Sequence, residues 1–436
     1  MKCFEVSNVI FTVLLFSSRL CYADSDDVIN LKIKQSGFVG LEAGQVVHGE
    51  DFTAGASNPI LIKVWQQRLL FQYVNDAALS ERIRVIIAME CQLNYSYPLT
   101  TANRETESGR WTVYPDRAEG TYSCGDPSAP FLQFGFGYFP FKTDPDVQNL
   151  GEYLFRSGTY PLYVINSFNR PYARLLGLRA TLTFFETFRE DFLLASDYLN
   201  VPLQDWSFSY LASYTIAQCV DVGGGIMFAH CFPTDNSAVT PLPANNSAAL
   251  DYINENGDTM NYTFKGTKIM ARAAFDPKPL LPFFNEIMGK KDLRLYGELC
   301  VVGWQNQTNY DTIDFPYQYY NNRLDRTVWM VGANIPAFKM LDVLSLEFEY
   351  FPNRYPNSYQ FVYTSLVPTP TPNTTGLPWK WSLYAKKTFL KKFAIIGQVA
   401  RDHFVFTNSN TNAQIKQDVL NEPGDMWWVL RLNANF

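Results

Sequence analysis

The sequence has few residues of the kinds that form enzyme active sites and metal centres. It contains only three histidines, His48, His230 and His403, in 436 residues. It has no H-E-x-x-H, Walker A or G-x-S-x-G motif and no pair of CxxC motifs. A hydrolase that combines a scattered serine with His230 or His403 is an alternative that no motif supports, because nucleophile and base must lie within hydrogen-bonding reach. We therefore expect a protein that is not an enzyme and has no metal or cofactor.

Long apolar runs and an excess of positive charge are also lacking. Beyond the N-terminal leader, no segment approaches the roughly 20 consecutive apolar residues of a membrane-spanning helix. Charged residues make up 18% of the chain, and the formal net charge is −6. A chain with this balance lacks the basic surface of a general nucleic-acid binder, so we expect no nucleic-acid partner.

The cysteines do not form a recognisable disulfide framework. Five lie beyond the leader, an odd and scattered set: Cys91, Cys124, Cys219, Cys231 and Cys300. Bridges between Cys91 and Cys124 or between Cys219 and Cys231 are alternatives. We expect small apolar residues instead.

The N-terminus has the pattern of an export signal. Lys2 is followed by an apolar stretch over 9–16 and then by "CYADSDD", with small residues at Cys21 and Ala23. This pattern predicts a signal peptide over 1–23, cleaved after Ala23. If the exported protein resides in a membrane without a spanning helix, a closed β-barrel is the remaining way to pair its backbone polar groups.

Segments of about ten residues with alternating apolar and polar side chains recur along the chain, as in "LDVLSLEFEYF" and "WKWSLYAKK". In a strand, alternate residues point to opposite faces, so each segment predicts a strand with one apolar and one polar face. We expect about sixteen strands, with fourteen as the alternative. They are placed at 36–48, 60–75, 82–95, 110–124, 129–138, 155–166, 174–185, 206–216, 220–230, 260–275, 292–304, 326–336, 342–351, 379–389, 393–406 and 425–436.

The connections between these segments alternate in length. Long polar connections are expected at 231–259, 305–325, 352–378 and 407–424. Short ones are expected at 76–81, 125–128, 167–173, 217–219, 337–341 and 390–392, with a compact apolar piece at 276–291. Outer-membrane barrels have short periplasmic turns and long external loops. The sequence therefore predicts an all-β fold, a transmembrane antiparallel up-and-down barrel over 24–436; a soluble β-sandwich is the distant rival.

The polar faces of the later strands supply candidate functional residues. If they face a lumen, their charges tune solute selectivity, or they pair with one another and brace the wall. The pore-lining candidates are Arg294, Tyr296, Glu298, Glu347, Glu349, Lys386 and Arg431.

The C-terminal strand resembles the sorting signal of Gram-negative outer-membrane proteins. Five residues share the apolar face of this strand: Phe436, Ala434, Leu432, Leu430 and Trp428. The resemblance implies that the barrel-assembly machinery reads Trp428, Leu430, Leu432 and Phe436 as an assembly signal. It also implies residence in the outer membrane of a Gram-negative bacterium, in contact with its lipid.

A second stretch, 131–164, resembles the strand-and-loop segment of large porin-like barrels. In that family a Gly- and Phe-rich run, here "GFGYFPF", precedes a loop that folds toward the lumen. The segment 139–153 then becomes a constriction-loop candidate through Lys142, Asp144, Asp146 and Glu152. An ordinary external loop that packs on the rim is the alternative.

The porin-like resemblance extends over most of residues 80–436, with "DLRLYGEL", "ANIPAFKMLDVLSLEFEYF" and "GQVARDH" as further matching pieces. It implies passive diffusion of small hydrophilic solutes through a water-filled channel, and a homotrimer. The alternative is a non-conducting barrel whose surface loops serve adhesion or polysaccharide binding.

Overall fold

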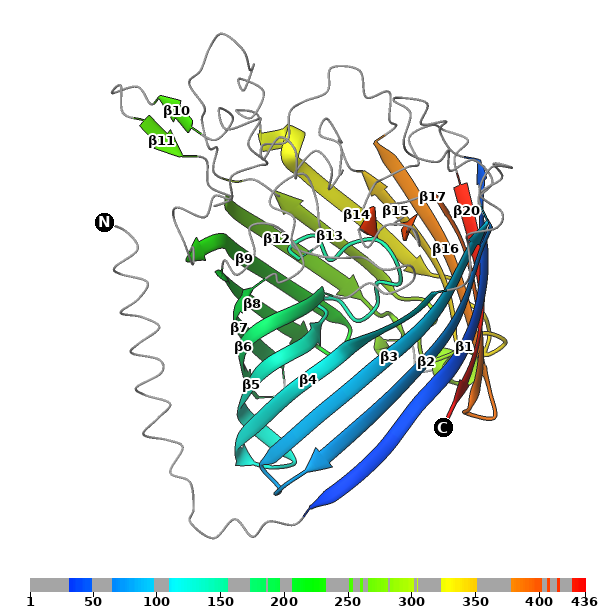
Figure 1. The fold of residues 1–436 in the computed structure, drawn as a ribbon, viewed down its shortest axis with the longest axis horizontal. Coiled ribbons are helices and arrows are strands. Elements are labelled where there is room, and N and C mark those ends of the chain that lie inside the picture. The colour runs from blue at the N-terminus through cyan, green and yellow to red at the C-terminus, as the bar shows by residue number, and fades with distance from the viewer. Residues whose placement is uncertain are drawn as a thin grey trace.

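Alternating side chains produce strands over most of the described chain. The computed structural model describes residues 31–48, 65–97, 110–155, 173–185, 187–196, 206–232, 251–253, 259–261, 266–280, 283–301, 304, 323–350, 378–401, 406–407, 414–415 and 426–436. Sixteen strands join in one closed antiparallel barrel, in which sequence neighbours pair (Figure 1). The strands are β1 (Lys32–His48), β2 (Trp65–Ala78), β3 (Ile83–Tyr97), β4 (Arg110–Asp126), β5 (Ala129–Phe141), β6 (Ala173–Phe184), β7 (Phe188–Ser196), β8 (Trp206–Ile216), β9 (Val220–Phe232), β12 (Gly266–Phe275), β13 (Leu295–Val301), β14 (Thr327–Asn334), β15 (Val343–Tyr350), β16 (Trp379–Phe389), β17 (Phe393–Arg401) and β20 (Met426–Asn435).

A few small elements are not part of the barrel. Two separate two-stranded pieces are formed by β10 (Asp251–Ile253) with β11 (Thr259–Asn261) and by β18 (Phe406–Thr407) with β19 (Gln414–Ile415). Single helical turns occur at η1 (Lys278–Leu280), α2 (Phe284–Ile287) and η3 (Arg323–Arg326). Among the described residues there is no helix of sufficient length and apolar character to cross a membrane.

The barrel closes where the first strand pairs with the last. β1 lies antiparallel to β20, with Leu41 opposite Leu432 and Glu42 opposite Arg431. Past the end of β20, the Phe436 amide donates to the carbonyl oxygen of Gly37 at 3.0 Å, and the Gly37 amide donates to that of Phe436 at 3.2 Å. Each strand of the ring therefore has a neighbour on both sides, and the sheet has no edge.

The number of strands and the sorting of their connections by length are confirmed. Short connections join β2–β3, β4–β5, β6–β7, β8–β9, β14–β15 and β16–β17, and 276–294 joins β12 to β13. The alternate connections, such as 142–172, 302–326 and 351–378, are longer. Both strands of the closing pair have one end on the short-turn side, as an even-numbered up-and-down barrel requires.

One predicted strand is wrong and one was missed, so the total of sixteen arose from two errors that cancel. The ring does not include 155–166, because β5 pairs directly with β6, with Phe141 opposite Ala173. The turn expected at 167–173 therefore does not join two ring strands, and 156–172 lies outside the described residues. The missed strand is β7, "FREDFLLAS". Three consecutive charged residues near its start hide the apolar alternation.

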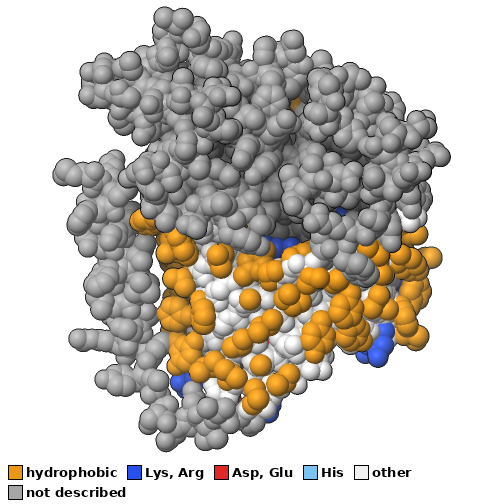
Figure 2. All heavy atoms as spheres, in the orientation of Figure 1, with side chains coloured by type: hydrophobic (Ala, Val, Ile, Leu, Met, Phe, Trp, Pro, Cys, Tyr) orange, Lys and Arg blue, Asp and Glu red, His pale blue; other side chains and the backbone are white. Residues whose placement is uncertain are grey.

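The two faces of the wall differ in chemistry as the alternation predicts. On β15, Phe348 is 44% exposed, whereas the neighbouring Glu347 and Glu349 are 1% and 0% exposed. On β20, Leu430 and Leu432 are exposed and Arg431 is buried. On these two strands apolar side chains thus point outward and charged ones inward, and hydrophobic groups cover much of the outer wall that Figure 2 displays.

The cysteines test the two bridges that the sequence left as alternatives. Cys91, Cys219, Cys231 and Cys300 are free, so neither of the two alternative bridges forms. Cys124 is buried, at 3% exposed. Sequence spacing alone does not reveal which cysteines approach each other in space.

The strand conformation at Gly137 leads to a prediction about stability. Gly137 in β5 has φ of +115°, and a Cβ atom there would lie 2.1 Å from the carbonyl oxygen of Ala118. Gly137→Ala should therefore lower the free energy of unfolding by at least about 1–3 kcal/mol, the usual magnitude of such backbone strain. Thermal unfolding followed by circular dichroism measures this as a lower midpoint. The matched control is Gly397→Ala in β17, where a Cβ would meet no atom within 4 Å; equal midpoints for the two variants would contradict the prediction.

Candidate functional site

The inner face of the barrel is divided into two sectors of different chemistry. From β5 to β14 the inward side chains are largely apolar and belong to one buried cluster, which includes Leu175, Leu193, Met227, Met270 and Met330. From β15 through β20 and on to β4, buried charged residues predominate: Glu347, Glu349, Lys380, Arg401, Arg431, Glu42, Arg68, Glu90, Asp116 and Glu119. An apolar inner wall would be unfavourable against water, so the first sector needs a cover.

The cover is the chain that follows β5. Residues 142–155 turn into the ring and lie along the inner face, visible in Figure 1 as the cyan coil inside the barrel. Val147, Leu150, Tyr153, Leu154 and Phe155 are at most 1% exposed and belong to the same cluster as the wall residues. Full burial of a large apolar side chain contributes about 1.5–3 kcal/mol, so packing alone favours this position strongly. We call 142–155 the inward segment.

Glu347 on β15 fixes the tip of the inward segment. Its carboxylate accepts hydrogen bonds from three consecutive backbone amides, those of Gln148 at 2.6 Å, Asn149 at 3.0 Å and Leu150 at 2.8 Å. The Tyr296 hydroxyl donates a fourth, at 2.8 Å. Hydrogen bonds to an ionised acceptor are about twice as strong as neutral ones, and here they pair amides that have no strand partner.

Two further wall carboxylates, Glu298 and Glu349, hold the turn that follows this tip. Glu298 on β13 accepts from the backbone amides of Glu152 at 2.8 Å and Tyr153 at 2.6 Å. The Tyr153 hydroxyl donates to Glu349 on β15 at 2.6 Å. Lys268 on β12, which is fully buried, donates to the carbonyl oxygen of Leu154 at 3.4 Å. The inward segment is thus attached to three strands.

The inward segment is also closed upon itself. The Glu152 carboxylate accepts from the Thr143 amide at 2.8 Å, the Thr143 hydroxyl at 2.7 Å and the Asp144 amide at 2.7 Å. The turn between the two arms needs Gly151, whose φ of +93° lies in the region that favours glycine. A side chain at this position would also crowd the Glu298 carboxylate, 3.3 Å from the ideal Cβ.

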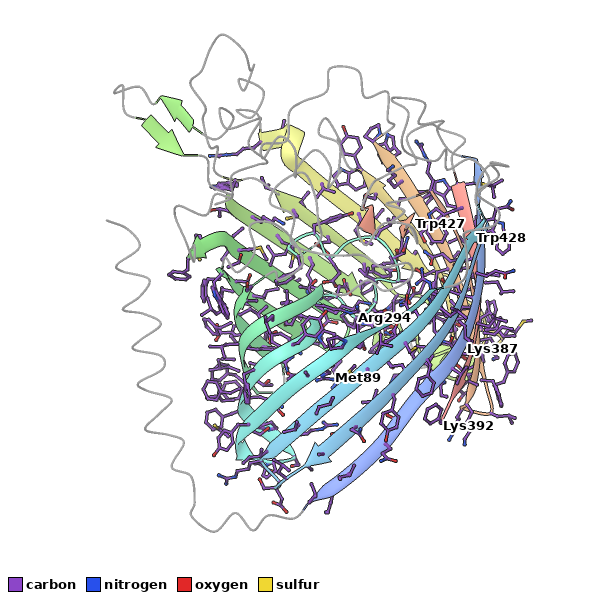
Figure 3. All side chains as sticks on the ribbon, in the orientation of Figure 1. Met89, Arg294, Lys387, Lys392, Trp427 and Trp428 are labelled. Atoms are coloured by element: carbon purple, nitrogen blue, oxygen red, sulfur yellow. The ribbon has the colours of Figure 1, made fainter. Side chains whose placement is uncertain are left out.

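Two cations from the β12–β13 connection bind Asp146 of the inward segment. Lys291 Nζ lies 2.7 Å from Asp146 Oδ1, and Arg294 Nε lies 2.9 Å from Asp146 Oδ2. Arg294 also approaches Asp221 at 3.6 Å and Asp276 at 4.0 Å. Figure 3 shows Arg294 within the ring of strands.

Burial shifts the proton equilibria of the inward segment. It raises the pKa of Asp144 and of Glu152, because the charged carboxylate is poorly solvated there. It lowers the pKa of Lys142 for the same reason, although neighbouring carboxylates oppose the shift. Burying these charges therefore costs free energy, which the hydrogen bonds from backbone amides offset in part.

The polar sector carries ion pairs and hydrogen bonds that link strands of the wall. Arg431 Nε on β20 donates to Glu42 on β1 at 2.7 Å, and Arg68 Nε on β2 lies 3.5 Å from the other oxygen of the same carboxylate. Asp116 on β4 binds Gln72 and Arg174, both at 2.6 Å. These contacts form a charged inner wall opposite the apolar sector.

The structure places all seven pore-lining candidates in or beside the interior but gives them different contacts. Tyr296, Glu298, Glu347 and Glu349 contact the inward segment, Arg294 pairs with Asp146, and Arg431 pairs with Glu42. Lys386 on β16 is half-buried and has no ion-pair partner among the described residues. Of the constriction candidates, Asp144, Asp146 and Glu152 are at most 3% exposed. Their role in selectivity stays a prediction.

Several residues of the site were not found from sequence. The wall charges Glu42, Arg68, Asp116 and Glu119 could have been found from strand alternation, but only with the correct strand register. The backbone amides of Gln148, Asn149 and Leu150 carry no signal in the sequence at all. Among the described residues no group of three or more histidine, cysteine or acidic side chains could hold a metal ion.

Comparison with known proteins adds little to this description. No family model matches the sequence, and no curated protein sequence matches it. A variant of the Rhodopseudomonas blastica porin with three substitutions aligns over 93% of this chain and 100% of its own, with 8% identity and a TM-score of 0.44. A variant of that porin with two substitutions gives the same coverage and identity and a TM-score of 0.41. At TM-scores below 0.5 these similarities carry no argument about function, and the fold rests on the strand order above.

The contacts of Glu347 predict faster hydrogen exchange when its charge is removed. Glu347→Gln keeps the shape of the side chain but replaces one acceptor oxygen with an NH2 group, which faces backbone donors. Each hydrogen bond to a charged group contributes about 1.5–3 kcal/mol, so exchange of the 148–150 amides should accelerate by about tenfold or more. Hydrogen–deuterium exchange with mass spectrometry measures this.

The matched control is Glu190→Gln on β7. Glu190 lies on the outer face of β7, opposite to the face of Asp191; it accepts from the Tyr210 hydroxyl at 2.6 Å and has no described contact with the inward segment. We expect its variant to leave exchange at 148–150 unchanged. Equal exchange in Glu347→Gln and the parent protein would show that the wall carboxylate does not hold the segment.

Proposed function

We propose that this protein is an outer-membrane channel of the porin type, through which small hydrophilic solutes diffuse passively. One observation carries the proposal: a closed sixteen-strand barrel has an apolar outer face and an inner sector, from β16 through β20 to β4, whose wall carries charged side chains. Barrels of sixteen to eighteen strands are wide enough to leave an aqueous passage. Water and solutes would pass along the charged sector, between β15 and β4.

The outer face supports insertion in a lipid bilayer. Near the long-connection ends of three adjacent strands, Trp329, Tyr350 and Trp379 form an aromatic group with ring centroids 5.0–5.8 Å apart. Near the short turns, Phe188 contacts Phe184 and Tyr214. Aromatic belts at the two ends of an apolar wall are typical of transmembrane barrels, whose ends lie at the two lipid–water interfaces.

Lysines and tryptophans lie toward opposite ends of the wall. Figure 3 shows Lys387 and Lys392 toward one end of the barrel and Trp427 and Trp428 toward the other. Lys387 and Lys392 belong to the hairpin of β16 and β17, which places them on the short-turn side. In an outer membrane this side faces the periplasm, where a lysine can reach lipid headgroups or water.

The wall glutamates serve this function as anchors of the inward segment. Glu298, Glu347 and Glu349 are occupied by its hydrogen bonds, which supports the bracing role over a direct contact with solutes. The inward segment would then set the width of the passage by its position. Ion preference would come from other inward charges, of which Lys386 is the clearest candidate.

Three further parts of the proposal come from the N-terminal sequence pattern, from the resemblance of the last strand to outer-membrane sorting signals and from the porin-like resemblance. The first is a signal peptide over 1–23, which lies outside the described residues. The second is recognition of Trp428, Leu430, Leu432 and Phe436 by the barrel-assembly machinery of a Gram-negative bacterium. The third is assembly as a homotrimer. Native mass spectrometry of the detergent-extracted protein tests the last of these.

A single-channel measurement tests the channel function. The mature chain, Asp24–Phe436, is refolded in detergent and added to a planar bilayer. We expect stable current steps whose size increases with salt concentration, because ions would cross a water-filled lumen.

Two outcomes separate the channel from its alternatives. A folded, inserted but silent protein would end the channel proposal and favour a non-conducting barrel that acts through the connections at 231–259, 305–325 and 352–378. A chain that stays soluble without detergent would remove the membrane assignment itself.

Lys386 provides a prediction about ion preference. At about 10 Å in water, one unit charge lowers the energy of a passing anion and raises that of a passing cation by about 0.4 kcal/mol each, so Lys386→Gln should lower the anion-to-cation permeability ratio about fourfold. Reversal potentials in a salt gradient measure the ratio. Lys391→Gln, in the exposed β16–β17 turn, is the matched control and should leave it unchanged; equal shifts in both variants would exclude Lys386 as a determinant.

A further inference from the structure

A cavity of about 670 Å³ lies at the short-turn end of the barrel and shares Arg294 with the contacts of the inward segment. It is bordered by the β8–β9 turn, the β12–β13 connection and the β14–β15 connection. Its polar lining is Gln218, Asp276, Lys278, Lys290, Arg294 and Lys339. Four cationic side chains thus face a cavity that contains a single carboxylate.

Two of the connections that border this cavity are held together by a buried carboxylate, that of Asp292. Asp292, 1% exposed, accepts hydrogen bonds from the backbone amides of Gly289 at 2.8 Å, Ala337 at 3.1 Å and Phe338 at 3.0 Å. It thereby joins the β12–β13 connection to the β14–β15 connection. The Lys278 ammonium group donates to the backbone oxygen of Asp292. The cavity is therefore bounded by connections that are bonded to each other.

The four cations differ in how their charge is balanced. Lys278 Nζ lies 2.9 Å from Asp276, and Arg294 pairs with Asp146. Lys290 is exposed and has no ion-pair partner within the described ranges. Lys339 donates to the backbone oxygen of Glu286 and likewise has no carboxylate partner in the described part of the chain. Two ammonium groups at the cavity thus remain without a matching negative charge.

We propose that this cavity binds a phosphate group, carried by a small solute or by a lipid headgroup. A phosphate group concentrates negative charge and several acceptor oxygens in a small volume, and lysine ammonium groups bind it as point charges. The volume exceeds that of the phosphate itself and is within the range of small-ligand pockets, which leaves room for an organic part. The proposal concerns a site at the mouth of the barrel and does not depend on whether the barrel conducts.

Isothermal titration of the full mature chain in detergent tests the site, with inorganic pyrophosphate as the probe and sodium chloride of equal ionic strength as the blank. We expect saturable binding with a Kd of about 1 mM or tighter. Lys290→Gln/Lys339→Gln should weaken binding by about tenfold or more, because it removes both unmatched charges. Lys391→Gln/Lys392→Gln, which removes two exposed charges at the same end but away from the cavity, should leave the Kd unchanged.

A second titration, with dihexanoylphosphatidylglycerol below its micellar concentration, identifies the source of the phosphate. Lipid binding that is stronger than pyrophosphate binding and is lost in the Lys290/Lys339 variant assigns the site to a headgroup. Stronger pyrophosphate binding assigns it to a solute. Absence of saturable binding by either probe, or an equal loss in both double variants, would overturn the proposal. Lys290→Gln alone removes no described bond and keeps the test valid if the double variant fails to fold.

Discussion

The interior depends on two glutamates that accept hydrogen bonds from backbone amides of another segment. Glu347 and Glu298 together bind five amides between Gln148 and Tyr153. A chain that leaves a sheet and crosses a barrel loses its strand partners, and its buried amides must find acceptors elsewhere. The carboxylates provide these acceptors, and the position of the inward segment follows from where β13 and β15 place them.

The inward segment and the apolar sector of the wall bury each other's apolar side chains. A wall lined with Leu175, Leu193 and Met227 would be unfavourable in contact with water, and the inward segment brings Leu150, Leu154 and Phe155 to cover it. The barrel thus contains a hydrophobic core on one side of its interior and a charged wall on the other. In the proposed channel, this asymmetry would confine the passage to the charged side.

Most of the strands and the facing of their side chains could be predicted from sequence because both depend on a local, two-residue period. Glu347 and Glu349 could be placed inside because Leu346 and Phe348 alternate with them. The strand β7 was missed because three consecutive charged residues, Arg189, Glu190 and Asp191, hide the apolar alternation. In the structure Asp191 points inward and pairs with Arg189 at 2.8 Å. The apolar sector was not predicted for another reason: where both faces of a strand are apolar, its side chains no longer alternate in polarity. The acceptor role of Glu347 depends on amides nearly 200 residues away, a separation that no local pattern encodes.

The pairing of β1 with β20 has a consequence for how the chain acquires its structure. Glu42 and Arg431 are 389 positions apart, so the contact that seals the ring is among the most remote in the molecule. Loop-closure entropy opposes such contacts until the intervening chain is ordered. Before sealing, β1 and β20 would each present an unpaired strand edge that could pair with another chain. A partner that occupies those edges before the ring closes would therefore protect the barrel from such pairing.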